Sequence, residues 1–411
     1  RIISSFIILV AFNTANADSI KWLHLFGEDS SQYPNMVRAV EEFEAKTGHT
    51  VVMQYLENES FKAKLPTMLQ SNDRPDIFYS WGGGVMYDQA RAGFLRDVSS
   101  VVPDSYLDTV SAAAADAFTF EGQRVGLPLQ VSQVAWWYNK DLMSQAGVDV
   151  SQIKMWDDLL GAVKQIKAAG ITPICMGGKD KWPVHFVWTH LHIRNGGKGL
   201  FLESLNNGGW DRPEYIRSGE QMLELVELEP FQKGWLAATW PDQAGFFGDG
   251  KCAMAFMGNW MYGAQASNSA SGEGLADANM GMFNMPMTSG GIGDSGDTLG
   301  GINGWLFSST ASDAAVELMM HYVSLDIQKE DASNGAYIPI VKGADGSLTN
   351  PFLQQVAKNI SNSEYHQIFY DQFLGADIGR VVNDVSTDLA AGIISAEEAT
   401  QAVQEAWEFN Q

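Results

Sequence analysis

Positive charge, cysteine and long apolar segments are all scarce in this chain. Lys and Arg together number 26 against 49 Asp and Glu, a formal net charge of −23 over 411 residues. A chain this acidic is repelled by nucleic acids and by anionic membrane surfaces, which argues against both as partners. The acidic residues are dispersed along the sequence, a pattern that favours solubility over a preference for cationic solutes. No segment after residue 17 approaches the length of a transmembrane helix.

The two cysteines, Cys175 and Cys252, both lie in apolar stretches that resemble strands. Free thiols are commonly buried in such stretches. An oxidising compartment would also permit a disulfide bond between them. We favour two buried free thiols, with the disulfide as the alternative.

Motifs of common enzymes are missing as well. The chain lacks the patterns G-x-S-x-G and H-E-x-x-H and the P-loop. Paired carboxylates such as Asp157 and Asp158 fall in helical segments, where they are typical of solvated faces. On a predicted helix, His185 and His192 share one face but lie about 10 Å apart, and His190 points elsewhere, so one metal ion could not bind all three. We expect no catalytic residue, no metal site and no cofactor.

The first 17 residues have the features of a signal peptide. An apolar run over 2–12 precedes a small-residue cleavage motif that ends at Ala17. The run starts after Arg1 without a Met, so the basic first part of the signal peptide looks truncated. Cleavage would leave Asp18 as the first residue. No cysteine follows the cleavage site, so we expect a freely diffusing periplasmic protein without a lipoprotein anchor.

Strand and helix patterns alternate in the first part of the mature chain. Strands are predicted over 20–26, 51–56 and 77–80, with helices over 33–46 and 60–70 between them. This order predicts a parallel sheet covered by helices, the α/β fold class. A chain of this length is also too long for one core, so we expect two lobes.

Later segments contain further strand and helix signals. The glycine and proline at 126–129 predict a break before an apolar strand at 134–138. A strand is predicted at 171–175, after a helix over 156–169 whose start is poorly capped because Met155 lacks a side-chain acceptor. A capping box formed by Ser395 and Glu398 begins a last helix.

The most informative segment is 246–260, which reads FFGDGKCAMAFMGNW. Gly250 and Lys251 form a turn before the apolar strand at 252–257, and the following loop ends at Trp260. Ligands of open α/β sheets bind at the carboxyl ends of strands. We therefore expect the indole of Trp260 to contact a ligand.

An aromatic residue, a Gly-Lys turn, a small apolar strand and Gly-x-Trp in this order resemble a signature of the extracellular solute-binding proteins of carbohydrate ABC transporters (the maltose-binding-like family, solute-binding family 1). Segments at 137–142, 300–307 and 336–339 resemble the same family in the same order. The resemblance implies a type II periplasmic-binding-protein clamshell, with the ligand cleft between two discontinuous lobes. It places lobe 1 at 18–128 and 285–335, and lobe 2 at 129–284 and 336–411.

The resemblance also implies a function. A member of this family would capture a sugar or short oligosaccharide by lobe closure, without enzymatic activity. It would act as a monomer and deliver the sugar to ABC permease subunits in the inner membrane, which a cytoplasmic ATPase drives. One alternative is a binding protein of the same fold for a non-sugar solute such as a polyamine. A secreted carbohydrate-active enzyme is a less favoured alternative.

Candidate ligand-binding residues stand at glycine-rich strand ends. Indole rings can stack on sugar rings, and neighbouring polar groups can bind hydroxyls. The aromatic candidates are Trp260, Trp182, Trp81 and Trp305. The polar candidates are Asn303, Asn259, Asp180, Lys181, Glu28, His24, Asn58 and Gln130. Other tryptophans lie in apolar, periodic segments and are expected to pack in the core, namely Trp136, Trp137, Trp156, Trp188 and Trp407.

Overall fold

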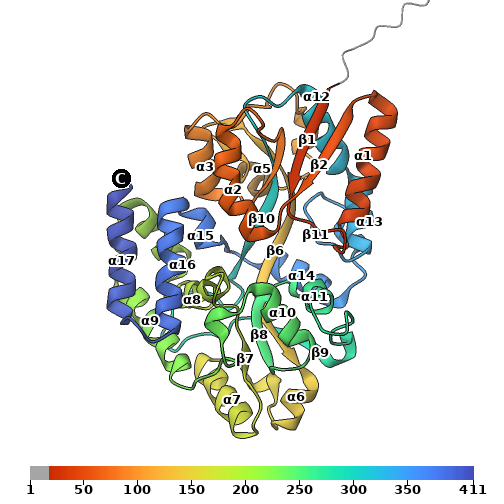
Figure 1. The fold of residues 1–411 in the computed structure, drawn as a ribbon. Coiled ribbons are helices and arrows are strands. Elements are labelled where there is room, and N and C mark those ends of the chain that lie inside the picture. The colour runs from red at the N-terminus through yellow and green to blue at the C-terminus, as the bar shows by residue number, and fades with distance from the viewer. Residues whose placement is uncertain (1–17) are drawn as a thin grey trace, which may run out of the picture.

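The computed structural model describes residues 18–411, so the predicted signal peptide at 1–17 lies outside the described residues. The molecule is elongated, with strands β1 and β2 in one half and β7 and β8 in the other (Figure 1). Two long strands, β6 (Gly126–Asn139) and β10 (Thr298–Phe307), run between the halves.

The first half is the predicted β-α-β-α-β unit. Strand β1 (Ser19–His24) pairs in parallel with both β2 (Thr50–Tyr55) and β3 (Ile77–Ser80), which confirms the parallel sheet. Helices α1 (Tyr33–Thr47) and α2 (Asn58–Gln70) connect these strands. Helix α1 ends at Gly48, whose φ of 77° is the left-handed conformation that glycine adopts without strain.

Strand β6 is continuous, so the predicted break at 126–129 is wrong. Its first part pairs with β10, and its second part pairs with β8 (Met254–Gly258) and β9 (Met280–Phe283). Pro128 lacks an N–H, and the ladder accommodates it at an irregularity between Asn303 and Gly304 of β10. The resulting sheet order is β2-β1-β3-β10-β6-β8-β7.

The remaining elements are the other helices and the short strands, of which β7, β11 and β12 join the main sheet and β4 and β5 form a separate pair. In the first half they are α3 (Gly83–Arg91), α4 (Asp104–Leu107), α5 (Ala112–Asp116), β4 (Thr119–Phe120), β5 (Gln123–Arg124), α12 (Asp313–Tyr322), α13 (Leu325–Ser333) and β11 (Ile338–Pro339). In the second half they are α6 (Lys140–Gln145), α7 (Trp156–Ala168), β7 (Ile174–Cys175), α8 (Trp182–Asn207), α9 (Pro213–Val226), α10 (Trp240–Gly248), α11 (Met261–Ser267), α14 (Pro351–Asn362), β12 (His366–Ile368), α15 (Tyr370–Phe373), α16 (Ala376–Ala390) and α17 (Ala396–Phe409). The capping box that begins α17 is present as predicted.

Two large hydrophobic clusters form separate cores. The first core draws on residues from Ile20 to Leu129 and from Trp305 to Tyr337. The second core draws on residues from Val134 to Leu299 and from Phe369 to Val403. Four of the tryptophans expected in the core are fully buried in the second core, namely Trp136, Trp137, Trp156 and Trp188. The fifth, Trp407, is half-buried and packs against that core.

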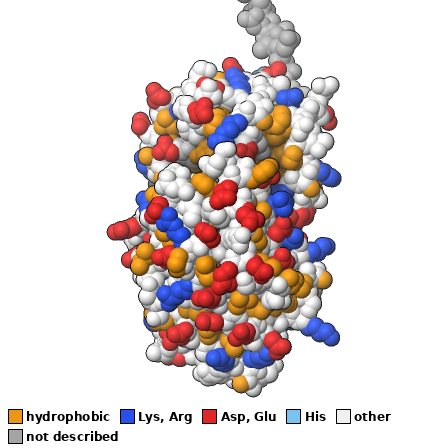
Figure 2. Space-filling view, turned by 90° about the vertical axis from the view of Figure 1, so that its left-hand side faces the viewer, with side chains coloured by type: hydrophobic (Ala, Val, Ile, Leu, Met, Phe, Trp, Pro, Cys, Tyr) orange, Lys and Arg blue, Asp and Glu red, His pale blue; other side chains and the backbone are white. Residues whose placement is uncertain are grey.

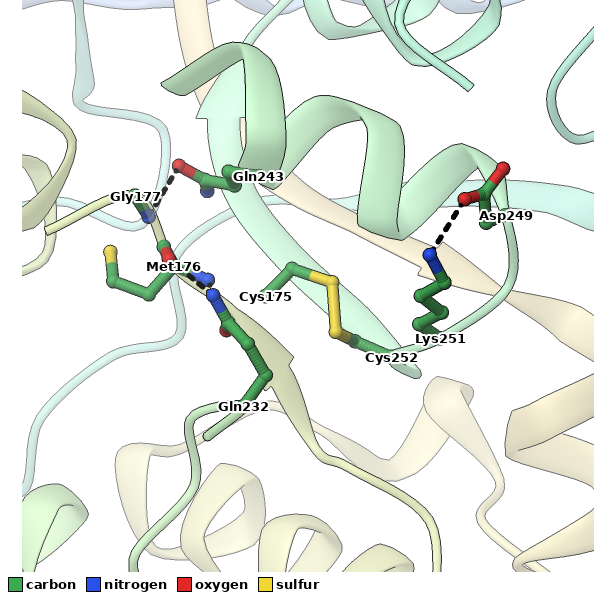
Figure 3. Close-up of a disulfide and its surroundings, with 8 residues drawn as sticks. All are labelled: Cys175, Met176, Gly177, Gln232, Gln243, Asp249, Lys251 and Cys252. Atoms are coloured by element: carbon green, nitrogen blue, oxygen red, sulfur yellow. Dashed lines mark hydrogen bonds and ion pairs between the residues drawn. A yellow bond between two sulfur atoms is a disulfide. The ribbon is translucent and has the colours of Figure 1, made fainter. Parts of the chain in front are cut away.

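Cys175 and Cys252 form a disulfide, so the prediction of free thiols is wrong (Figure 3). Strands β7 and β8 are parallel neighbours, and Cys175 stands opposite Ala255, three residues after Cys252. This pairing brings the two Cα atoms to 5.5 Å, within the range that a disulfide requires. Both cysteines are fully buried.

Charges of both signs are interspersed on the face shown in Figure 2, with apolar side chains in small separate spots. Among residues 18–411, we find no helix that is both long enough and apolar enough to cross a membrane.

Candidate ligand-binding site

A cavity of about 460 Å³ lies between the two cores. On the first-core side its wall comes from the loops that follow β1, β2 and β3, whose carboxyl ends meet at one sheet edge. On the second-core side the wall comes from the start of α8, the start of α10 and the segment after β8. The crossing strands β6 and β10 contribute residues to the same cavity. A site of this kind can bind a small molecule from both sides.

Most of the predicted ligand-binding residues line this cavity. Trp260 and Asn259 reach it from the carboxyl end of β8, as the glycine-flanked motif predicts. Seven of the predicted residues line the cavity in all, namely Trp260, Trp182, Trp81, Asn303, Asn259, Asn58 and Gln130.

Trp305 does not line the cavity, which corrects its prediction as a ligand contact. It is fully buried in the first core, with its ring centroid 5.0 Å from that of Trp22 and 5.3 Å from that of Tyr79. Successive side chains of a strand point to opposite faces. Trp305 stands two residues after Asn303 on β10, so by this alternation both leave the same face of the strand, Asn303 at the cavity and Trp305 inside the first core next to it.

The two polar candidates of the β1–α1 region also lie away from the cavity wall. His24 is buried, and its Nδ1 accepts a hydrogen bond of 3.3 Å from the backbone N–H of Phe26. Burial lowers the pKa of His24 to about 4, and the hydrogen bond partly opposes this effect. Glu28 points to solvent, while its neighbour Asp29 lines the cavity.

Asp180 and Lys181 support the wall instead of forming it. The Asp180 carboxylate accepts a hydrogen bond of 2.7 Å from the backbone N–H of Trp240 at the start of α10. Lys181 pairs with Asp384 of α16 at 2.6 Å. Both interactions fix the loop that leads into Trp182.

Hydrogen bonds and the disulfide also hold the end of strand β7, which precedes that loop. Figure 3 shows Gln232 and Gln243 beside the disulfide. The Gln232 side chain hydrogen-bonds both the N–H and the carbonyl of Met176, and the Gln243 carbonyl accepts from the N–H of Gly177. Side-chain amides therefore hold Met176 and Gly177 directly after β7, and the disulfide holds the end of β7 itself.

Aromatic rings form much of the wall. The centroid of Trp182 lies 5.8 Å from that of Trp240 and 6.4 Å from that of Trp260, which in turn lies 6.1 Å from that of Phe369. Sequence reasoning missed Trp240. A signal for it existed, because Trp182 and Trp240 each precede a proline at the start of a helix.

Amide side chains provide oriented polar groups in the same wall. Gln130 donates to the hydroxyl of Tyr79 at 2.9 Å, and Asn259 accepts from the backbone N–H of Gln133 at 3.0 Å. The Asn303 carbonyl oxygen is buried and has no hydrogen-bond partner among residues 18–411. Aromatic faces with a few fixed polar groups suit a ligand that is polar at its rim and apolar on its faces.

The bacterial extracellular solute-binding protein family matches residues 27–330. The chain belongs to this family. It is 24% identical over 206 residues to an uncharacterised ABC transporter extracellular-binding protein of Pyrococcus horikoshii, covering 50% of this chain and 46% of the relative. It is 22% identical over 213 residues to the multiple sugar-binding protein of Streptococcus mutans, with 48% and 47% covered. The chain thus spans about half the length of these curated relatives.

The fold is the two-lobed, type II α/β clamshell. A solved structure from work on xylan utilisation by Caldanaerobius polysaccharolyticus superposes with a TM-score of 0.86 at 23% identity, covering 94% of this chain and 99% of that one. In this solute-binding protein the first lobe surrounds the first core, the second lobe surrounds the second core, and the cavity is the cleft between them.

Carboxylates outnumber cations in the cleft of the solute-binding protein. Asp29, Glu57 and Asp371 line it, with Lys62 as the cationic lining side chain. The pKa of Tyr55 at the cleft edge is raised by burial and, to a smaller extent, by the nearby Glu57 and Asp29. Carboxylate oxygens accept hydrogen bonds, so this wall suits hydroxyl or ammonium donors.

Asp371 is the carboxylate that is buried. One of its oxygens accepts from the amides of Asn383 at 3.3 Å and Gln372 at 3.2 Å, and the other lies 3.8 Å from Nε2 of His185. Burial lowers the pKa of His185, with Asp371 opposing the shift. The sequence offers no signal for Asp371, because its approach to the cleft depends on how the segment after β12 packs.

The other histidines of α8 are part of the second core. His190 and His192 are fully buried, and their ring nitrogens have no hydrogen-bond partner within the described chain. No group of three or more His, Cys, Asp or Glu in residues 18–411 is arranged to hold a metal ion.

Proposed function

We propose that this solute-binding protein captures a sugar or short oligosaccharide in the cleft and delivers it to an ABC importer. The observation that carries the proposal is the cleft wall, in which indoles from both lobes stand beside fixed amide and carboxylate groups. An indole face can stack on the C–H face of a sugar ring, while amides and carboxylates bind its hydroxyls. The Streptococcus relative, a multiple sugar-binding protein, supports the same solute class.

Capture would depend on lobe closure. Because each lobe supplies part of the wall, only the closed state offers all contacts at once, and a bound solute would favour that state. Met285 and Leu299 pack in the second core. We therefore move the start of the second segment of lobe 1 from 285 into β10. Because Leu129 and Tyr337 pack in the first core, we also move the ends of the two lobe 1 segments from 128 to 129 and from 335 to 337.

Transport would require partners that the chain does not contain. The protein would diffuse in the periplasm as a monomer after removal of residues 1–17, dock its closed form on inner-membrane permease subunits, and rely on a cytoplasmic ATPase for energy. It would carry out no covalent chemistry itself. Its family is one of extracellular proteins, which supports this location.

A polyamine is the second candidate solute. The lining carboxylates Asp29, Glu57 and Asp371 favour it, because ammonium groups pair with carboxylates and bind to indole faces.

A thermal-shift screen separates these candidates. The protein would be unfolded and refolded with its disulfide intact to strip bound solute, then mixed with sugars, polyols, amino acids and polyamines. A ligand at about 100 times its dissociation constant stabilises the native state by about 2.7 kcal/mol. Stabilisation by a set of related glycans supports the sugar proposal. Stabilisation by polyamines alone would overturn it.

A further inference from the structure

The tryptophan that begins α8 contacts the opposite lobe directly. Trp182 belongs to the second core, and its indole N–H donates a hydrogen bond of 3.0 Å to the carboxylate of Glu59. Glu59 lies in the first turn of α2, a helix that buries Phe61 and Leu65 in the first core. The bond therefore joins the two lobes across the cleft.

Lys62, one turn further along α2, extends this contact. Its ammonium lies 5.4 Å from the ring centroid of Trp182 and 5.3 Å from that of Trp81, so it sits over one indole of each lobe. The same ammonium lies 3.5 Å from the Glu59 carboxylate, which also accepts from the amide of Asn58 at 2.6 Å. Glu59 and Lys62 are thus held in place by their own lobe while they bind the other.

These contacts leave little of Trp182 for a solute. The side chain is only 7% exposed, its N–H is donated to Glu59, and an ammonium lies over its ring. Trp260 differs, because it is half-buried at the cleft and its ring neighbours are aromatic residues of its own lobe. The two indoles therefore have different tasks.

We propose that Glu59, Lys62 and Trp182 form an interlobe latch that favours the closed state before any solute binds. Trp182 is then a positioning residue for lobe closure and not a residue that stacks on a sugar. This role rests on the proposed function only because closure serves to capture the solute. A hydrogen bond to a charged acceptor and a cation over an indole face both strengthen when desolvated. Apparent affinity falls with the fraction of binding-competent protein, so losing the latch weakens every solute by the same factor.

Small-angle scattering of the solute-free, refolded full chain tests the latch. Trp182→Phe removes the N–H and keeps an aromatic ring, while Lys62→Met removes the ammonium and keeps an apolar side chain. We expect each to shift the ratio of open to closed protein about 10-fold toward open, which increases the radius of gyration. Trp407→Phe is the matched control, because it loses an indole hydrogen bond to the Leu205 carbonyl far from the cleft.

Two results would overturn the latch. One is wild-type scattering that fits an open arrangement without solute, and the other is a pair of variants whose scattering equals that of the wild type. Glu59→Gln, which keeps an acceptor but loses the charge, gives a smaller shift and reports on the same contact if Trp182→Phe folds poorly.

Solute titrations then separate the latch from the proposed function. With two different glycans that bind, Trp182→Phe weakens both by the same factor, whereas loss of a stacking residue weakens them unequally, and unequal loss would also overturn the latch. If no sugar binds, the proposed function fails, and the scattering comparison still decides the latch.

Discussion

The two lobes stabilise their halves of the cleft in different ways. The first lobe presents loops at the carboxyl ends of three parallel strands, and the pairing of these strands holds them in register. The second lobe contains both cysteines of the chain, and its disulfide joins the strands that lead to Trp182 and to Trp260. The difference indicates that the aromatic wall of the second lobe is positioned by a covalent link directly behind it.

The buried titratable groups also differ between the lobes. The second lobe contains the buried His192 and the partly buried His366, whose pKa values desolvation lowers to about 3 and about 4. The first lobe buries Asp331, whose pKa burial raises to about 7 while hydrogen bonds from Asn35 and Tyr337 oppose the shift. The lobes should therefore respond differently to acid.

Removing the disulfide should destabilise the second lobe far more than the first. Cys175→Ala with Cys252→Ala opens a loop with a sequence separation of 77 residues. The free energy of unfolding of the second lobe should fall by about 4 kcal/mol, because the unfolded chain regains loop entropy. Calorimetric unfolding measures this effect, with the first-lobe transition as the internal control. An equal shift of both transitions would contradict the assignment of the bond to one lobe.

Trp260 in the second lobe and Trp305 in the first lobe both follow a glycine-containing pair, and together they provide the next test. Trp260→Ala should weaken binding of a stabilising glycan about 100-fold, since a central aromatic contact is lost. Trp305→Phe is the matched control, because Trp305 is buried in the first core. Titration calorimetry should find its affinity unchanged while its stability falls. Equal affinity loss in both variants would show that the cleft assignment is wrong.

Acid should destabilise the second lobe more than the first. An unfolded histidine binds a proton below a pKa of about 6.5. Folded His192 stays neutral until about pH 3, so its contribution to stability is lost as pH falls from 6.5 toward 3. At pH 5 this loss is about 2 kcal/mol, and His192→Leu should abolish it. Unfolding by denaturant at pH 7 and pH 5 measures the difference.

The first lobe should show a flatter response. Burial lowers the pKa of His24 to about 4, so the contribution of His24 to the free energy of unfolding falls as pH falls from 6.5 to 4. Asp331 acts in the opposite sense, because the folded state binds a proton below about pH 7 and the unfolded state only near pH 4, so its contribution rises as pH falls through that range. A first-lobe stability that falls with pH as steeply as that of the second lobe would contradict the opposing contributions of His24 and Asp331.

The predictability of the two lobes differs as well. Local patterns were enough for the first sheet, because strand-length apolar runs alternate with amphipathic helices there. The segment 246–260 also predicted that Trp260 follows the carboxyl end of a strand, where it lines the cavity, since glycine turns mark both ends of that strand. The disulfide was not the favoured prediction because the pairing of β7 with β8 is a tertiary contact. The burial of Trp305 was missed because its ring packs against Trp22 and Tyr79, which come from other strands.

Residues that reach the cleft from distant segments could not be predicted. Lys62 and Glu59 read as ordinary solvated helix charges, and their role appears only once α2 faces the start of α8. Asp371 follows a strand of three residues, too short to give a sequence signal. Their positions depend on long-range packing and not on local propensity.

A helix cap should give the smallest effect. Met155 precedes α7 without a side-chain acceptor, and only the carboxylate of Asp158 reaches back to its N–H. Met155→Thr would complete a capping box and should raise the free energy of unfolding of the second lobe by about 1 kcal/mol. Denaturant unfolding of the variant should show an unchanged first lobe, and destabilisation would contradict the cap geometry.

Hydrogen–deuterium exchange with and without the most stabilising glycan tests most directly whether the two lobes share one binding site. We predict slower exchange in the first lobe at 55–62 and 79–84 and in the second lobe at 259–264 and 369–372, all of which contribute to the cleft wall. Protection confined to one lobe, or located away from these segments, would contradict a site formed between the lobes.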